Sequence, residues 1–302
     1  MTAVGSFPAE GSSPEESIRN YCSLQLELGF DVVTDGEPRH DMISYLAHDI
    51  PGLGELAGKP AVVGRVAPPV DLGRCLKSRD LEQVLRVLRE TRATASAKIA
   101  ITGPVTLGFS CALVNRGPYS GPNDSQLYED LGLALGSLAS HLQSMGAIVQ
   151  IDEPGLSGGF MDPGRAATCL RLVTSDLHPE MAILHVCGRL SPQLHHELLR
   201  LEGVGTLSHA FAGNPENIRA LDRGELVRAH KKLGVGCARV DIAKPEEADD
   251  PEKILGVLEA VRQEVGDDLL AYVHPDCGLR STGLESARAI LRNLSVALTR
   301  FH

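Results

Sequence analysis

The strongest chemical pattern in this sequence is a histidine and a cysteine two residues apart at the end of an apolar run. His185 and Cys187 close the run at residues 182–186, and a glycine follows them. Side chains two residues apart on a strand point to the same side, so the imidazole and the thiol should converge. A second thiol, Cys277, follows another apolar run. One histidine and two cysteines suit zinc, and a catalytic zinc keeps one position open for substrate. Soft thiolates disfavour magnesium and calcium.

A structural role is the alternative for the same residues. A histidine-x-cysteine pair occurs by chance, and cysteine is among the residue types most often buried. The metal hypothesis gains from the position of both thiols at predicted strand ends beside glycines. Seven cysteines without dense spacing indicate reduced thiols. The other five are interpreted as structural: Cys22, Cys75, Cys111, Cys169 and Cys237.

Short apolar runs alternate with amphipathic stretches along the whole chain. Strand-like runs lie at residues 3–7, 31–34, 61–66, 98–102, 148–151, 182–186, 205–208, 234–240 and 269–273. Leucines at helical spacing predict a helix over 127–142, with Asp124 as one candidate N-cap and Gly146 at its end. Apolar strands alternating with helices are typical of a parallel sheet buried on both faces. Nine runs exceed the eight places of a barrel, so 61–66 or another run is expected outside the ring.

The fold prediction is one (βα)₈ barrel domain covering residues 1–302. A doubly wound open sheet is the alternative, but no Gly-x-Gly-x-x-Gly follows the first run. Polar residues end strands along the whole chain, which favours a barrel because its site collects residues from many strand ends at one face.

Composition restricts the partners. The 302 residues carry a net charge of −10, with 4% aromatics and no tryptophan, which argues against nucleic acid and against an anionic membrane surface. No apolar stretch approaches the roughly 18 residues that span a bilayer. The N-terminus has no basic segment followed by a long apolar one. A cytoplasmic enzyme is expected.

Six ordered motifs make the sequence resemble the C-terminal catalytic domain of cobalamin-independent methionine synthase. The resemblance is closest to the short core methionine synthases that lack the N-terminal domain. The motifs are VGSFP at 4–8, DGEPRHDM at 35–42, ITGP at 101–104, QIDEP at 150–154, HVCG at 185–188 and PDCG at 275–278. The resemblance implies a barrel of the methionine synthase and uroporphyrinogen decarboxylase type, with Zn²⁺ held by His185, Cys187 and Cys277.

The implied reaction is the methylation of homocysteine to methionine, with the substrate activated as a zinc thiolate. A free thiol has a pKa of about 8.5 and is mostly protonated at neutral pH, whereas coordination to a metal deprotonates it. The resemblance also implies that Glu37 and Asp152 bind the substrate amino group and that Ser6, with Gly5, meets its carboxylate. Glu37 as a solvated loop charge and Asp152 as a helix cap are the alternatives. Glu153 is a weaker candidate for substrate binding, because helix capping or support of a neighbouring residue would explain it equally well.

The sequence departs from the family at the fourth zinc ligand. The family has a glutamate on the next strand, and Ala210 stands at the matching position. Three explanations compete: His209 replaces the glutamate, the metal uses three protein ligands, or the ancestral activity has been lost. Adjacent strand residues point to opposite faces, so His209 would need an irregular strand end.

The methyl donor is the second departure. The chain shows no cluster of lysine and arginine for a polyglutamate tail and no tryptophan to stack a pterin. The core enzymes that the sequence resembles accept methyl groups from corrinoid donors, so the resemblance implies methylcobalamin or a corrinoid protein in preference to methyl-folate. The family's proton-donating histidine is absent, and Asp241 is the candidate in its place. Rival functions are a zinc-thiolate alkyltransferase acting on another thiol or donor, and a non-catalytic relative that binds a thiol or a corrinoid.

Overall fold

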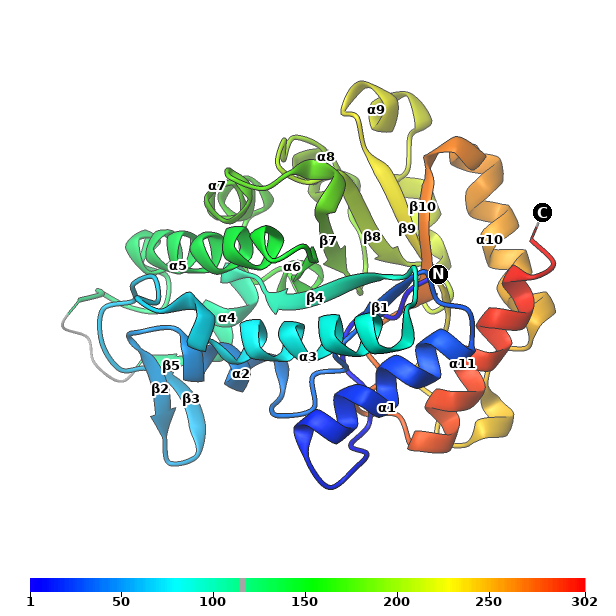
Figure 1. Cartoon of the computed structure of the whole chain (residues 1–302). Helices are drawn as coiled ribbons and strands as arrows, with labels where there is room; N and C mark the ends of the chain where they lie inside the picture. The colour runs from blue at the N-terminus through cyan, green and yellow to red at the C-terminus, as the bar shows by residue number, and fades with distance from the viewer. Residues whose placement is uncertain (114–117, 302) are drawn as a thin grey trace.

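Seven parallel strands form the curved wall of a barrel (Figure 1). The computed structural model describes residues 1–113 and 118–301. The strands follow one another around the wall in chain order, and each pairs in parallel with the next. They are β1 (Val32–Thr34), β4 (Ser96–Thr102), β6 (Ile148–Asp152), β7 (Ala182–Val186), β8 (Thr206–Ala210), β9 (Lys232–Ala238) and β10 (Leu270–Pro275).

The N-terminal segment closes the ring between β10 and β1. The amide of Thr2 donates to the carbonyl of Val273 at 3.0 Å, and the amide of Val32 donates to the carbonyl of Met1 at 3.2 Å. Met1 and Thr2, which lead into the predicted strand at residues 3–7, therefore take the eighth place, and residues 3–7 themselves form no regular strand. Closure of the ring distinguishes this fold from an open doubly wound sheet, and the predicted barrel is confirmed.

Helices pack around the outside of the wall (Figure 1). The α-helices are α1 (Pro14–Glu27), α2 (Met42–Asp49), α3 (Leu76–Thr91), α4 (Pro104–Ser110), α5 (Ser125–Ser144), α6 (Pro154–Ser157), α7 (Pro163–Thr174), α8 (Pro192–Leu199), α9 (Arg223–Arg228), α10 (Pro251–Val265) and α11 (Leu284–Leu298). Short 3₁₀ helices span Leu72–Arg74, Pro179–Met181, Pro215–Ala220, Pro245–Glu247 and Asp267–Leu269. The predicted helix over 127–142 is α5, where Asp124 caps the first turn and Gly146 follows the last with a φ of 97°. None of the helices described here is long and apolar enough to cross a bilayer.

A small second sheet lies outside the ring. It contains β2 (Leu53–Leu56), β3 (Lys59–Val62) and β5 (Ala112–Leu113), in the order β2-β3-β5. The predicted run at 61–66 overlaps β3, so it is the surplus strand expected outside the barrel.

Glu153 joins the loops that follow β4 and β6. Its buried carboxylate accepts hydrogen bonds from the amides of Val105 and Thr106 at 2.8 and 2.9 Å, and from the Thr106 hydroxyl at 2.6 Å. A carboxylate at the first turn of a helix satisfies free amides and complements the helix dipole. Capping of α4 is therefore the role that the structure shows for Glu153.

We expect Gly103→Ala to destabilise this junction. A Cβ at Gly103 would lie 2.2 Å from Oε1 of Glu153, and overpacking of a buried site costs about 1–3 kcal/mol. Urea denaturation followed by circular dichroism measures the change. Gly256→Ala in α10 is the matched control, because a Cβ there meets nothing within 4 Å. Equal stability of the two variants would contradict the packing described here.

Candidate metal centre

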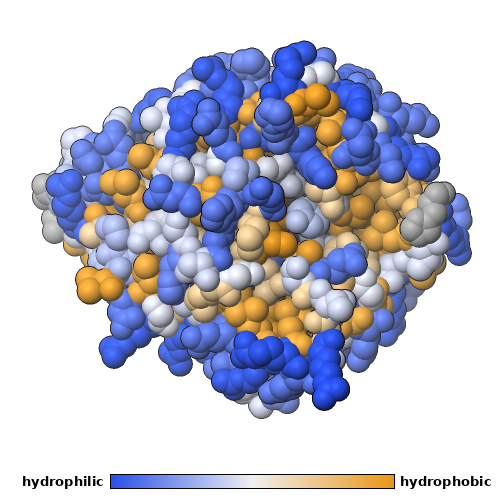
Figure 2. Space-filling model, turned by 45° about the horizontal axis from the view of Figure 1, so that its top comes forward, coloured by the Kyte–Doolittle hydropathy of each residue, from blue (hydrophilic) through white to orange (hydrophobic). Residues whose placement is uncertain are grey.

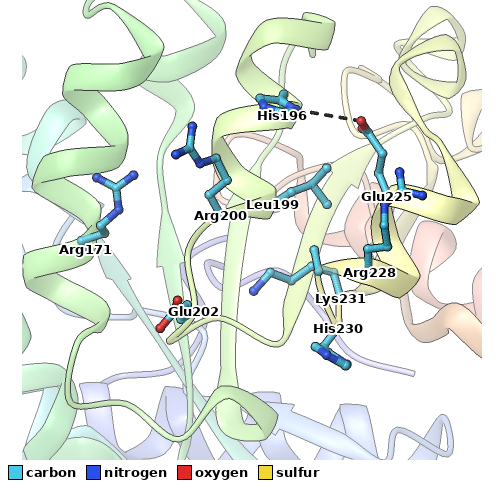
Figure 3. Close-up of a pocket in the computed structure, with 10 residues that line it drawn as sticks. Arg171, His196, Leu199, Arg200, Glu202, Glu225, Arg228, His230 and Lys231 are labelled. Carbon is cyan, nitrogen blue, oxygen red and sulfur yellow. Dashed lines mark ion pairs between the residues drawn. The ribbon is translucent and has the colours of Figure 1, made fainter.

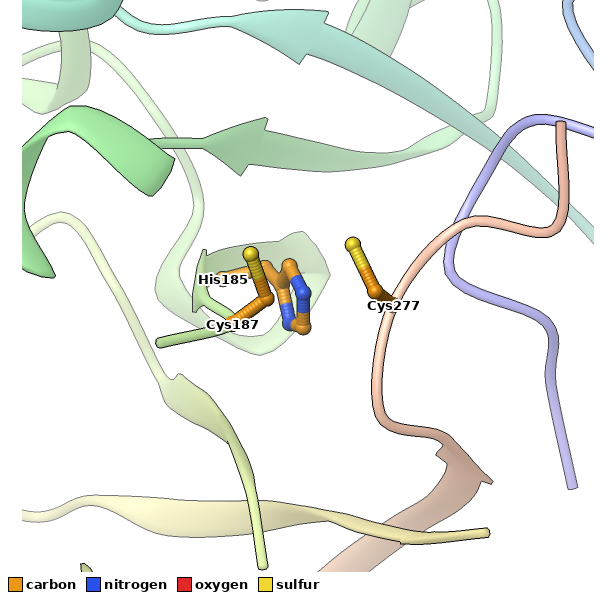
Figure 4. A group of neighbouring side chains, drawn as sticks. All are labelled: His185, Cys187 and Cys277. Carbon is orange, nitrogen blue, oxygen red and sulfur yellow. The ribbon is translucent and has the colours of Figure 1, made fainter. Parts of the chain in front are cut away.

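One histidine and two cysteines meet at the carboxyl ends of the strands (Figure 4). His185 lies on β7, Cys187 directly follows that strand, and Cys277 lies two residues beyond the end of β10. Their ligand atoms all lie within 4.8 Å of one another. Within residues 1–113 and 118–301 this is the only group of three or more such side chains with that spacing. The structure thus brings together the three ligands expected from the sequence.

The side chains of Cys187 and Cys277 interact with each other. A hydrogen bond with Cys187 lowers the pKa of Cys277 to about 7, even though burial opposes the shift. The same bond, together with burial, raises the pKa of Cys187. The pair therefore gives up its first proton readily and offers one thiolate, the form in which cysteine binds a metal.

The imidazole of His185 is buried and neutral. Burial lowers its pKa well below the usual value, and the neighbouring His274 adds to the effect. Its Nδ1 lies 2.8 Å from the Ser208 hydroxyl, whereas its Nε2 is buried without a hydrogen-bond partner. A buried polar nitrogen left unpaired costs free energy, and coordination of a metal removes that cost. One nitrogen and two sulfur donors fit zinc.

A cavity of about 370 Å³ opens onto the three ligands. Ser6, Glu37 and Asp152 line it as well, so the predicted substrate-binding residues and the predicted ligands share one space. The complete lining is Val4, Ser6, Glu37, Asp41, Met42, Asp152, Pro154, His185, Cys187, Cys277, Gly278, Arg280 and Ser281. Arg280, which the sequence reasoning missed, also holds the loop around Glu37, since its guanidinium donates to the carbonyls of Glu37 and His40.

Glu37 is held by a buried lysine. Lys77 Nζ donates to Glu37 Oε1 at 2.7 Å, and both side chains are buried. The ammonium of Lys77 also lies 4.1 Å from the centre of the Tyr45 ring. These contacts exclude the alternative that Glu37 is a solvated loop charge.

Asp152 is oriented through a glutamine. Gln150 Nε2 donates to Asp152 Oδ1 at 2.7 Å, and Gln150 Oε1 accepts from the buried Lys98 Nζ at 2.6 Å. The same Nε2 also donates to the carbonyl of Val4 at 2.8 Å. A carbonyl oxygen only accepts, so this contact fixes the amide with its NH₂ group toward the carboxylate. Burial and the nearby Glu37 raise the pKa of Asp152.

The second oxygens of the two carboxylates converge. A Cβ at Gly5 would lie 3.8 Å from Glu37 Oε2 and 3.9 Å from Asp152 Oδ2. Among the described residues, no hydrogen bond from the protein reaches either oxygen. Two free carboxylate oxygens beside one glycine form a place where an ammonium group can bind.

Comparison with known proteins identifies the family. Residues 8–299 match the family described as "Cobalamin-independent synthase, Catalytic domain". The chain belongs to this family. It is 33% identical over 320 residues to a methionine synthase from Methanothermobacter marburgensis, and the match covers 99% of each chain. The resemblance predicted from the six motifs is confirmed.

Two more distant relatives are consistent with this family assignment. A 5-methyltetrahydropteroyltriglutamate–homocysteine methyltransferase from Corynebacterium glutamicum is 27% identical, with 97% of this chain matching 42% of the longer relative. The solved structure of a B12-independent methionine synthase from Shewanella sp. W3-18-1, in complex with selenomethionine, has a TM-score of 0.80 at 19% identity. That match covers 99% of this chain and 97% of the Shewanella chain, and it supports the barrel fold.

Two expected site residues lie away from the cavity. His209 points outward from β8, with its ring 5.7 Å from that of His195 on α8, because alternate residues of a regular strand face opposite sides. The expectation that His209 replaces the family's glutamate ligand is therefore corrected. Asp241 is exposed and does not line the cavity, so the geometry does not support its expected catalytic role. Ala210 is fully buried and offers no ligand atom.

A larger concavity, of about 920 Å³, lies where α7, α8 and α9 end (Figure 3). Its arginines are Arg171, Arg200 and Arg228, which stand in or directly after the last turns of these helices. Basic side chains there complement the negative ends of helix dipoles. Figure 2, in which the top of Figure 1 comes forward, shows hydrophilic side chains over much of this side with apolar patches between them. We therefore assign its arginines to the stabilisation of these helix ends and do not interpret the concavity as a binding site.

Proposed function

We propose that this chain is a zinc-dependent methyltransferase that converts homocysteine to methionine. The observation that carries the proposal is the shared cavity. It places two sulfur donors and one nitrogen donor beside two carboxylate oxygens that converge. A small amino acid with a thiol side chain is the ligand that such a cavity matches. Membership of the cobalamin-independent synthase family supports the same reaction.

His185, Cys187 and Cys277 would hold the metal. Zinc bound there lowers the pKa of a substrate thiol and keeps it nucleophilic at neutral pH. Three protein ligands leave room for a substrate atom, and Ala210 adds no fourth donor. The three-ligand explanation is therefore the one we adopt for the missing glutamate.

Glu37 and Asp152 would bind the substrate ammonium through their free oxygens. An ammonium favours the ionised form of a nearby carboxylate, so it offsets the burial and repulsion that raise the pKa of Asp152. Ser6 would meet the substrate carboxylate. A Cβ at Gly278 would lie 2.4 Å from the Ser6 hydroxyl, so glycine at this position is what allows Ser6 to border the cavity.

For the methyl donor we propose a methyltetrahydropteroylglutamate. The family is described as cobalamin-independent, and the Corynebacterium relative is named for a methyltetrahydropteroyltriglutamate donor. This proposal replaces the preference for a corrinoid, which the resemblance to the core enzymes implied. Phe109 and Phe160 provide an aromatic surface without tryptophan. Their ring centroids lie 3.8 Å apart in a stacked arrangement, and the two residues are 52% and 46% exposed. They follow β4 and β6, at the end of the barrel where the cavity lies.

Phe109→Ala should weaken the use of the donor while homocysteine binding stays the same. An aromatic contact is worth about 0.5–1.5 kcal/mol, so we expect the KM for methyl-folate to rise about 2- to 10-fold. Steady-state kinetics with each substrate varied in turn measures both constants. Leu133→Ala on α5, which is also 52% exposed, is the control. An equal rise in both KM values would contradict a specific donor surface.

The function is tested by methionine formation from homocysteine. The assay compares methyltetrahydropteroyltriglutamate with methylcobalamin, each with and without a chelator. The proposal predicts turnover with the methyl-folate, its loss with chelator and its recovery with zinc. Turnover with methylcobalamin alone would overturn the donor assignment. Bound zinc without turnover from either donor would overturn the reaction and favour a different thiol or a binding role.

A further inference from the structure

A chain of three hydrogen bonds leads away from the predicted ligand His185 into the barrel. His185 Nδ1 lies 2.8 Å from the Ser208 hydroxyl, which lies 2.8 Å from His274 Nε2. His274 Nδ1 lies 2.7 Å from the carbonyl oxygen of Pro275. His185, Ser208 and His274 are all at most 2% exposed, so water does not compete for these bonds.

The carbonyl of Pro275, which ends this series of hydrogen bonds, decides which group donates in each of them. A carbonyl oxygen only accepts, so Nδ1 of His274 carries the proton. Burial disfavours the charged form of the His274 ring, and neither of its hydrogen-bond partners carries a negative charge that would offset this effect. His274 is therefore neutral and its Nε2 accepts. The single hydroxyl proton of Ser208 must then point to His274. Its oxygen is left to accept from Nδ1 of His185, and the imidazole of His185 keeps a bare Nε2.

We infer that Ser208 and His274 are positioning residues that fix the tautomer of His185, so that its Nε2 lone pair is available to a metal. The role of this tautomer rests on the proposed metal site, but the tautomer itself is a property of the metal-free protein. The unpartnered, buried Nε2 of His185 is what this arrangement predicts. A hydrogen-bond partner on the far nitrogen commonly sets the tautomer and ring orientation of a metal-binding histidine.

Gly234 on β9 leaves space for the hydrogen bond between Ser208 and His274. Ser208 lies on β8 and His274 on β10, so their bond passes over the strand between them. A Cβ at Gly234 would lie 3.0 Å from His274 Nε2 and 3.0 Å from Ser208 Cβ. The absence of a side chain at this position thus lets the hydroxyl and the imidazole meet.

Nitrogen-15 NMR of the histidine-labelled, metal-free protein tests the inference directly. In the unmodified protein we expect His185 to be protonated on Nδ1 and not on Nε2. Ser208→Ala and His274→Phe each break the chain, so both should give a mixture of His185 tautomers or the reverse one. Ser208→Thr keeps the hydroxyl and should keep the Nδ1 tautomer. His195→Phe removes a buried imidazole outside the chain and should leave the His185 signals unchanged.

Zinc affinity, measured by competition with a chromophoric chelator, is the second readout. Loss of an outer partner of a metal ligand costs about 10- to 100-fold in affinity, and we expect this loss for Ser208→Ala and His274→Phe but not for His195→Phe. Protonation of His185 on Nε2 in the unmodified protein would overturn the inference, as would an unchanged tautomer in Ser208→Ala. An Nδ1 tautomer in a protein that binds no zinc would instead overturn the proposed metal site and leave the tautomer assignment standing.

Discussion

Cys187→Ser and Cys277→Ser should each abolish stoichiometric zinc binding and, with it, methionine formation. Each change removes a sulfur donor from a set of three, and a serine hydroxyl, which stays protonated at neutral pH, does not replace a thiolate. Loss of a direct ligand should exceed the roughly 10- to 100-fold cost of losing an outer partner. Elemental analysis of the purified variants and chelator competition measure the loss.

Cys169→Ala is the matched control for the two serine variants. Cys169 is a buried, free cysteine on α7 that is not part of the ligand group. It should keep one zinc per chain and full activity. If the Cys277 variant retained zinc with the affinity of the unmodified protein, the assignment of that ligand would be wrong.

Asp152→Asn should raise the KM for homocysteine about 10- to 150-fold. A hydrogen bond to a charged group contributes about 1.5–3 kcal/mol, and the amide keeps the size of the side chain while removing its charge. The fold should tolerate the change. Burial and Glu37 raise the folded-state pKa of Asp152 above the unfolded value, so keeping this group ionised at neutral pH costs folding free energy. The amide removes that cost, and the variant should unfold at an equal or higher urea concentration.

A thiol that lacks the amino group separates recognition from chemistry. With 4-mercaptobutyrate as acceptor, the unmodified enzyme and Asp152→Asn should have similar kcat/KM values, because no ammonium is present for Asp152 to bind. A loss in Asp152→Asn that is as large with 4-mercaptobutyrate as with homocysteine would contradict a role in binding the amino group.

The sequence predicted the barrel and the proximity of His185, Cys187 and Cys277 because both follow from the regular geometry of strands. Alternation along a strand places His185 and Cys187 on one side, and the carboxyl ends of parallel strands meet at one face, which brings Cys277 near. The same alternation, applied to β8, argued against His209 as a ligand, and the structure places that ring on the outer side.

Contacts between distant segments could not be predicted in this way. Lys77 lies 40 residues from Glu37 and Lys98 lies 52 residues from Gln150, and nothing in the local pattern marks either lysine as buried. The N-terminal segment closes the ring with too few hydrogen bonds for a regular strand, so its apolar pattern predicted its place but not its irregularity. Arg280, three residues beyond Cys277, could have been proposed from its position in the same strand-end loop.

X-ray absorption at the zinc edge, with and without homocysteine, tests the central claim most directly. The account predicts one zinc per chain with two sulfur neighbours and at least one nitrogen neighbour, and a third sulfur neighbour when homocysteine is added. A zinc environment without sulfur, or two sulfur neighbours that stay unchanged with saturating homocysteine, would contradict it.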